Sequence, residues 1–262
     1  MTAKGKIYLS FDVEEFDLPE EYGFGKVPDD EKFNLSAAGM NAALDVIEAE
    51  GIRATYFITS DFAERFPDMI RRMTETGGEI ASHGVSHSSF KTGDLAQSKS
   101  VLERLSGRSV TSFRMARLAP VDKKDILDAG FRCESSLNPV WLPGRYNHFS
   151  ASLLPFDESC GLRQYPVSAV PLVRFPLFWL SFKTLPGGLY RRLAVHTLRR
   201  TGYFNLYTHP WEYNAASRDP KWKIPGYITR HAGPAQAERL ARLIDALRPH
   251  GEFRTFQDDA EA

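Results

Sequence analysis

The chain has 262 residues, a length that (β/α) barrels reach as single domains, and we expect one domain over residues 1–262. Apolar residues make up 42% of it and charged residues 25%, which excludes a disordered or low-complexity chain. Because 33 basic residues balance 33 acidic ones, no net field draws the protein to nucleic acid. The 2 cysteines are too few for a disulfide framework or a thiolate zinc site.

The N-terminal residues lack the features of a signal peptide. Met1 to Lys6 leads directly into a strand-like segment, without an apolar stretch or a small-residue cleavage site. No segment is long and apolar enough to predict a transmembrane helix. These features predict a cytoplasmic protein.

Strand-like and helical segments alternate along the chain. Ile7 to Asp12 alternates apolar with small or polar residues, which predicts a strand that ends in carboxylates. Ser36 can cap a helix that runs through Glu50 and that Gly51 ends. Further strands are expected at 54–58, 79–82, 110–115 and 131–135, and the helices between them at 66–76, 94–105 and 123–129.

The alternation resumes after an irregular stretch that contains prolines. We expect a strand at 163–167, a helix at 188–200, a strand at 203–208, a helix at 234–247 and a strand at 253–256. This order favours a parallel sheet that is closed, or nearly closed, as a barrel, in which the carboxyl ends of the strands share the face where active sites lie. The reactive side chains fall at those ends: Asp12, Glu14, His83, Arg114, Glu134 and His209.

Two acids end the first strand. Side chains alternate along a strand, so the carboxylates of Asp12 and Glu14 project to the same side. With a cation present, one could ligate it while the other acts as a general base toward its bound water. The alternative is an ordinary acidic loop, because Glu15, Asp17, Glu20 and Glu21 follow at once.

His83 and His87 are four residues apart, a spacing that one helical turn brings to one side of a metal ion. Gly84 stands where the zincin pattern H-E-x-x-H carries its general base, so the base must come from elsewhere, and Asp12 is available. Two histidines and one carboxylate leave a coordination position open, as in catalytic zinc sites. Histidine pairs at this spacing also occur by chance on protein surfaces.

His209 and Arg114 complete the candidate catalytic set. His209 could protonate a departing amine, since imidazole titrates near neutral pH; the alternative is a histidine that packs against Trp211. Arg114 lies on an otherwise uncharged strand and would keep a carboxylate ionised, with Asp12 as the natural partner.

Aromatic residues indicate where a sugar could lie. Sugars often stack on aromatic faces, so we expect rim positions for Arg145 to His148, Tyr207, Trp211 and Glu212. The stretch from Pro171 to Lys183 is apolar, aromatic and interrupted by prolines. It is either a flap over the barrel or an interfacial element that contacts lipid, and the second would suit a lipid-linked sugar.

In order along the chain, five motifs resemble those of the polysaccharide deacetylase family, also called NodB homology or carbohydrate esterase family four. They are Phe11 to Glu14, His83 to His87, Phe113-Arg114, Gly130 to Ser136 and Leu206 to His209. The resemblance implies a distorted (β/α)7 barrel, similar to a TIM barrel. It also implies metal-dependent hydrolysis that removes N-acetyl or other acyl groups from amino sugars or polysaccharides.

By that resemblance, Asp12 would be the base, Arg114 would orient it and His209 would be the general acid. Glu14, His83 and His87 would bind a divalent metal ion, for which we expect Zn²⁺, with Co²⁺ or Ni²⁺ as alternatives. A backbone N–H near Arg117 would help to hold the oxyanion. The residues expected to contact substrate are Arg117, Tyr207, Trp211 and Glu134.

The chain also departs from the family pattern. The usual first motif has adjacent aspartates, whereas here Glu14 lies two positions after Asp12 and Glu15 follows, so either glutamate could be the ligand. Glu134 stands where the fourth motif usually has an aspartate, and the third motif lacks its usual prolines. Two other functions stay open: a metal-independent cyclic amide hydrolase of the allantoinase type, which both histidines disfavour, and a carbohydrate-binding pseudoenzyme.

Overall fold

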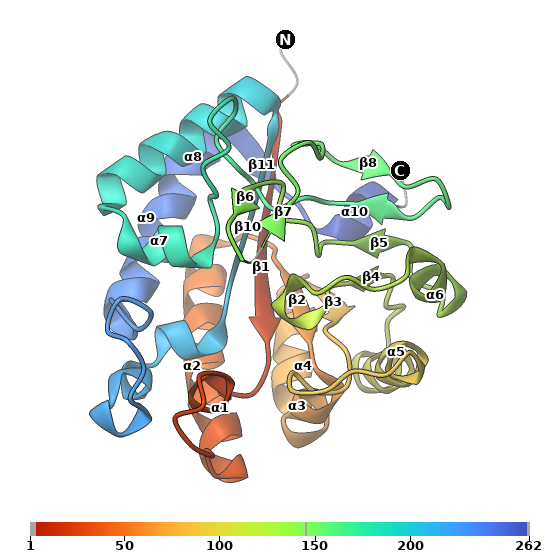
Figure 1. Ribbon diagram of the computed structural model, residues 1–262, viewed down its shortest axis with the longest axis vertical. Helices are drawn as coiled ribbons and strands as arrows, with labels where there is room; N and C mark the ends of the chain where they lie inside the picture. Colours follow the sequence, from red (N-terminus) through yellow and green to blue (C-terminus); the bar gives the residue numbers. More distant parts are fainter. Residues whose placement is uncertain (1–3, 145, 261–262) are drawn as a thin grey trace.

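The computed structural model describes residues 4–144 and 146–260 (Figure 1). Its centre is a curled sheet in which parallel strands surround a barrel interior. Their order is β10 (Tyr203–Thr208), β1 (Gly5–Val13), β2 (Thr55–Ile58), β3 (Glu79–Ser82), β4 (Ser112–Phe113), β5 (Cys133–Glu134) and β9 (Arg163–Gln164). The predicted distorted (β/α)7 barrel is therefore confirmed.

Irregular hydrogen bonds join the segment after β9 to β10. The Ser168 N–H donates to the Asn205 carbonyl at 3.0 Å, and the Asn205 N–H donates to Ser168 Oγ at 2.8 Å. Outside this ring, β8 (Phe156–Asp157) pairs antiparallel with β9, and β11 (Gly251–Phe253) pairs with the first residues of β1. The short strands β6 (Trp141–Leu142) and β7 (Tyr146–Asn147) form a separate hairpin.

Helices surround the sheet, with α7, α8 and α9 to the left of β1 in Figure 1 and α3 to α6 to its right. The α-helices are α1 (Leu18–Glu21), α2 (Asp29–Glu50), α3 (Ser60–Arg65), α4 (Pro67–Glu75), α5 (Gly93–Ser106), α6 (Lys123–Asp128), α7 (Trp179–Thr184), α8 (Gly187–Thr201), α9 (Pro234–Leu247) and α10 (Phe256–Ala260). Short 3₁₀ turns are η1 (Ala116–Leu118), η2 (Pro210–Tyr213), η3 (Ala215–Arg218), η4 (Pro220–Trp222) and η5 (Arg248–His250). No helix within the described residues is long and apolar enough to cross a bilayer.

The side chains of β1 alternate between two environments, as the period of two in its sequence predicts. Its odd-numbered residues from Ile7 to Val13 belong to the large apolar core shared with α2. On the other face, Tyr8 lies inside the barrel, where the ring of Phe256 stacks on it at a centroid distance of 5.0 Å. Asp12 lies further along the same face. The interior is thus apolar at the amino end of β1 and acidic at its carboxyl end.

Several predicted boundaries differ from the structure. The strands expected at 110–115, 131–135 and 163–167 are shorter, at Ser112–Phe113, Cys133–Glu134 and Arg163–Gln164, and two other elements begin elsewhere. The helix expected to start at Ser36 begins at Asp29, and Ser36 is fully buried inside it. The acids of the first turn suit the positive end of the helix dipole, so this start needs no serine cap. The last strand is Gly251–Phe253 rather than 253–256, because Phe256 enters the barrel interior as the first residue of α10.

Gly39 of α2 lies directly against the backbone of η2. A Cβ added at this glycine would lie 2.0 Å from the Pro210 carbonyl oxygen, which is rigid backbone. We therefore expect Gly39→Ala to lower the free energy of unfolding by about 1–3 kcal/mol, measured by urea denaturation. Gly93→Ala is the control, because a Cβ there meets nothing within 4 Å. Equal stabilities for the two variants would contradict this close approach.

Candidate active site

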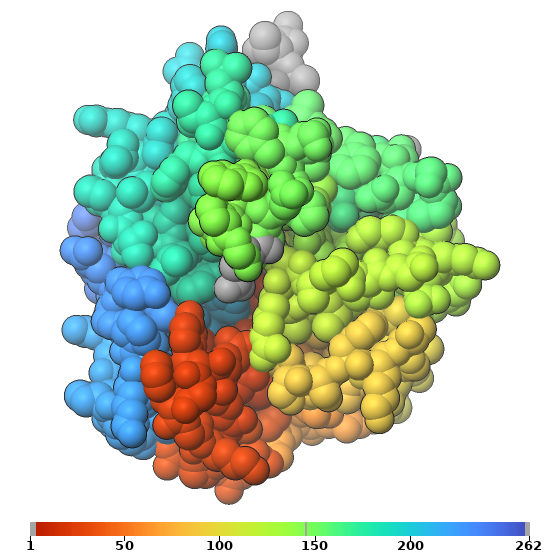
Figure 2. Space-filling model, viewed as in Figure 1, coloured from red at the N-terminus to blue at the C-terminus, as the bar shows by residue number. Residues whose placement is uncertain are grey.

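A small pocket lies at the carboxyl ends of β1, β3 and β10. It has a volume of about 60 Å³ and is lined by carboxylates, imidazoles and aromatic rings. Figure 2 shows α1 (red) beside the segment that follows β4 (yellow-green) on this face of the molecule. The lining residues are Asp12, Glu14, Asp17, Leu18, Glu21, Tyr22, His83, His87, Arg117, Leu118, Trp179, Tyr207, His209 and Trp211.

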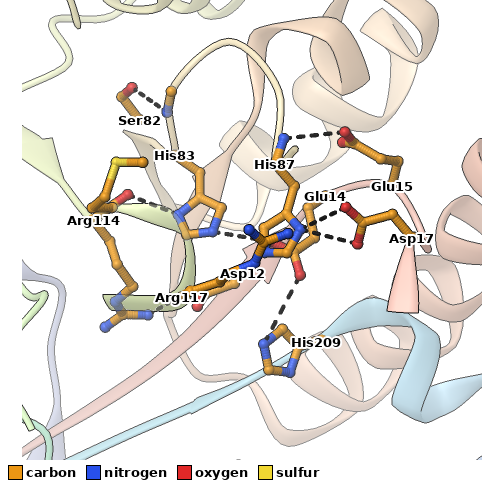
Figure 3. A network of polar contacts seen from close by, with 12 residues as sticks. Asp12, Glu14, Glu15, Asp17, Ser82, His83, His87, Arg114, Arg117 and His209 are labelled. Atoms are coloured by element: carbon orange, nitrogen blue, oxygen red, sulfur yellow. Dashed lines mark hydrogen bonds and ion pairs between the residues drawn. The ribbon is translucent and has the colours of Figure 1, made fainter. Parts of the chain in front are cut away.

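The predicted metal ligands converge in this pocket (Figure 3). Glu14 Oε2 lies 3.0 Å from Nε2 of His83 and 3.4 Å from Nε2 of His87. All three side chains are buried. Glu15 instead accepts a hydrogen bond from the backbone N–H of His87 at 3.1 Å. Of the two glutamates that the sequence left open, Glu14 is the one that faces both imidazoles.

The outer nitrogen of each imidazole meets an acceptor. His83 Nδ1 donates to the Arg114 carbonyl at 2.8 Å, and His87 Nδ1 lies 2.9 Å from a carboxylate oxygen of Asp17. Such contacts place a proton on Nδ1 and turn the lone pair of Nε2 inward, as in histidines that ligate metals. An inward lone pair and a carboxylate oxygen repel each other unless a proton or a cation lies between them. The donor set therefore fits a divalent cation such as zinc.

The protonation states of Glu14, His83 and His87 depend on burial and on the neighbouring charges. Burial raises the pKa of Glu14 to about 8, and it lowers the pKa of His83 to about 4. Burial also acts against the charge of His87, but Glu14, Asp17 and Glu21 outweigh it and raise the pKa of His87 to about 10. At neutral pH the cluster therefore holds protons, which a metal cation would displace.

Sequence reasoning missed the contribution of α1. Asp17, Glu21 and His87 each offer one atom within 4.8 Å of the others, a grouping that could hold a metal ion. The sequence suggested no role for either acid beyond the alternative of an ordinary acidic loop. Their spacing of four residues around Leu18-Pro19, a favourable helix start, was the sequence feature that could have placed them on one helical face.

Asp12 and Arg114 form the predicted pair. The fully buried Arg114 donates from Nη1 to Asp12 Oδ1 at 2.6 Å and to Ser10 Oγ at 2.9 Å. Its Nε and Nη2 donate to the carbonyl and the hydroxyl of Ser135, each at 2.8 Å. Burial would raise the pKa of Asp12, but Arg114, with His83 and His209, holds it below its usual value. Asp12 is thus kept ionised at the edge of the pocket.

His209 reaches the pocket from the end of β10. Its Nε2 lies 4.0 Å from Glu14 Oε1, and its Nδ1 lies 2.9 Å from Glu212 Oε1. The ring stacks on Trp211 at a centroid distance of 5.5 Å and meets the Trp179 ring nearly at right angles. The packing against Trp211 that the sequence offered as the alternative is therefore present together with access to the pocket.

The residues expected to contact substrate fall into two groups. Arg117, Tyr207 and Trp211 line the pocket, and Arg117 is hydrogen-bonded to Glu21. Glu134 is absent from the lining; it is buried and paired with Lys123.

The expected rim residues also divide. Glu212 is fully buried behind His209 instead of lying at the rim, because its carboxylate faces hydrogen-bond donors inside the protein, among them His209 Nδ1. His148 is exposed, and it is not among the residues that line the pocket. Arg145 lies outside the described residues.

The apolar stretch from Pro171 to Lys183 is neither all buried nor all exposed. Leu177 and Phe178 are buried, and Trp179 lines the pocket. Leu172 and Val173 at its tip are 90% and 69% exposed. The second half of the stretch therefore forms part of the pocket wall, and the tip projects to the surface.

Residues 2–129 match the model of the polysaccharide deacetylase family. This part of the chain therefore belongs to that family. The match contains the first three of the five motifs, and it confirms the family resemblance inferred from the sequence. A curated, uncharacterized 30.6 kDa protein of Geobacillus stearothermophilus is 29% identical over 65 residues, which are 25% of this chain and only 24% of that protein.

Solved structures share the polysaccharide deacetylase fold over nearly the whole chain. A putative polysaccharide deacetylase from Mycobacterium smegmatis is 18% identical, with 99% of this chain and 90% of that chain covered and a TM-score of 0.70. The allantoinase PuuE is 16% identical, with 100% and 91% covered and a TM-score of 0.69. A CE4 family pseudoenzyme from Bacillus anthracis is 9% identical, with 99% and 66% covered and a TM-score of 0.54. At these identities the likeness establishes the fold alone.

Proposed function

We propose that this protein is a metal-dependent hydrolase that removes an N-acetyl or other acyl group from an amino sugar or polysaccharide. The observation that carries the proposal is that Nε2 of His83 and Nε2 of His87 both approach Glu14 Oε2, at 3.0 and 3.4 Å. Asp12, on the same face of β1, adds a second acid beside them. This set supplies three candidate ligands and, in Asp12, a further carboxylate that is paired with Arg114.

Each residue has a distinct role in this proposal. When bound by Glu14, His83 and His87, a divalent ion such as Zn²⁺, or Co²⁺ or Ni²⁺, would acidify a water and polarise the acyl carbonyl. Asp12 would accept the proton of the attacking water, and Arg114 would keep Asp12 ionised and fixed.

On the other side of the pocket, Nε2 of His209 would give a proton to the departing amine. The contact between His209 Nδ1 and Glu212 supports this role, because it leaves Nε2 as the nitrogen that faces the pocket.

The walls of the pocket support a sugar as substrate. Tyr207, Trp179 and Trp211 provide aromatic surface, and Arg117 with Glu21 provides polar groups for hydroxyls. A lipid-linked sugar and a membrane contact through residues 171–183 stay predictions, as does a cytoplasmic location. The exposed Leu172 and Val173 would be the residues to meet lipid in such a contact.

The two alternative functions predict other measurements. A metal-independent hydrolysis of a cyclic amide such as allantoin would give no role to the paired imidazoles and Glu14, so it is the second candidate. A carbohydrate-binding pseudoenzyme would bind saccharides without turnover.

The deciding experiment measures bound metal and acetate release over a panel of N-acetylated saccharides, with allantoin included. We expect the wild type to release acetate, to lose this activity on chelation and to regain it with Zn²⁺. His83→Ala should lose both metal and activity, because one of the three converging donors is gone. A metal-loaded wild type that is inactive on every acetylated saccharide would overturn the proposal, and allantoin hydrolysis after chelation would favour the alternative.

A further inference from the structure

A buried ion pair lies behind His209, and none of the five motifs contains either partner. Lys183 Nζ, on α7, is 2.9 Å from Glu212 Oε2, in η2, and both side chains are completely buried. Removing two charges from water is costly, so a buried ion pair is weak evidence for stability and calls for another explanation.

Glu212 is surrounded by donors. Its Oε1 accepts from the backbone N–H of His209 at 2.8 Å and lies 2.9 Å from His209 Nδ1. Its Oε2 lies 2.9 Å from Lys183 Nζ and accepts from Gln236 Nε2 at 3.2 Å. Burial opposes ionisation, but Lys183 and His209 hold the pKa of Glu212 below its usual value. A carboxylate here requires the proton of a neutral His209 to sit on Nδ1.

Lys183 is held as firmly as Glu212. Its ammonium donates to the Ile228 carbonyl at 2.9 Å and lies 4.2 Å from the centre of the Trp211 ring. Trp179, one helical turn earlier on α7, packs its ring against His209. The ion pair and the aromatic wall of the pocket are therefore parts of one packed unit.

We propose that Lys183 and Glu212 are positioning residues for His209: the ion pair fixes the Nδ1–H tautomer and so keeps Nε2 available to the pocket. This deepens the proposed function and rests on it for the role of His209 as acid. Glu134, the buried glutamate of the fourth motif, pairs with Lys123 instead.

The first test is the ¹⁵N spectrum of the histidine rings, with His209→Gln used to assign the His209 signals. We expect neutral His209 of the wild type to carry its proton on Nδ1, a measurement that needs no substrate and no variant of the ion pair. A wild-type Nε2–H tautomer would overturn the proposal.

The second test is Glu212→Gln, which keeps the shape but replaces one oxygen by an NH₂ group that must face a donor. We expect the Nε2–H tautomer of His209 to become populated. In an acyl-release assay, kcat should fall on the order of 10- to 100-fold with little change in KM, the range known for carboxylates that orient a ligating histidine. A folded Glu212→Gln protein with the wild-type tautomer and kcat would overturn the proposal.

The third test is rescue by the charge-balanced double variant Lys183→Met/Glu212→Gln. Without the ammonium, the amide introduced by Glu212→Gln can direct its oxygen to His209 and its NH₂ to Gln236, whose Oε1 has no hydrogen-bond partner within the described residues. We expect the Nδ1–H tautomer and part of kcat to return. The same tautomer in the single and double variants would remove Lys183 from the proposal.

Glu79→Gln is the matched control for the loss of a buried carboxylate. Glu79 is held by Thr55 and Ser112, outside the pocket, so its loss should lower stability without changing the tautomer of His209. If the wild type releases no acyl group, the proposed function fails, while the tautomers of the wild type and Glu212→Gln still decide whether the ion pair positions His209.

Discussion

Asp12→Asn should lower kcat about 10²–10⁴-fold while leaving the fold and the bound metal in place. Asparagine has the shape of aspartate, and its oxygen can still accept from Arg114 Nη1, which now donates to Asp12 Oδ1 at 2.6 Å. It cannot accept a proton from water. Because the proposed ligands are Glu14, His83 and His87, metal content should stay at the wild-type level. The measurements are steady-state acetate release and bound metal on the same preparation.

The matched control is Glu79→Gln, which neutralises a buried carboxylate at β3 that does not line the pocket. It should reduce stability without a comparable loss of kcat. Wild-type turnover in Asp12→Asn would exclude Asp12 as the base. Loss of metal together with activity would instead indicate that Asp12 is a ligand.

Arg114→Met should lower the free energy of unfolding by about 3–5 kcal/mol, because it leaves the buried Asp12 carboxylate without its partner. The guanidinium also stacks over the Phe57 ring at 4.1 Å from its centre, so packing is lost together with the hydrogen bonds to Ser10 and Ser135. Urea denaturation measures the change. Adding Asp12→Asn to Arg114→Met should recover part of the loss, since the unpaired charge is then removed.

The pair also predicts a pH dependence. The folded pKa of Asp12 is below its ordinary value, so its contribution to stability is present above the unfolded pKa and is lost as pH falls through the folded value. In Arg114→Met this contribution should be missing, and the stability difference from wild type should shrink in acid. A difference that is constant from neutral to acidic pH would show that the carboxylate of Asp12 does not sense Arg114.

The sequence by itself determined the barrel and the strand that carries the acids. The period of two along Ile7 to Glu14 separates core residues from Asp12 and Glu14, because alternation is a local property of any strand. The motif at His83 and His87 was found from its spacing and the strand before it, but the expected helical turn was wrong: residues 83–87 form a loop in which Gly84 has a φ of 85°. These features depend on neighbours in the chain, and the structure brings the predicted residues together.

Only the tertiary structure decided which hydrogen-bond donor each acidic side chain contacts. Glu212 and Glu134 are both glutamates at expected site positions, yet Glu212 holds His209 while Glu134 pairs with Lys123. Glu14 was distinguished from Glu15 only by the direction in which each leaves the end of β1. In the sequence, Lys183 is only the polar end of an apolar stretch. Its ion pair with Glu212 forms because α7 packs against η2. Such choices depend on contacts between segments distant in the chain, and neither local periodicity nor residue type encodes them.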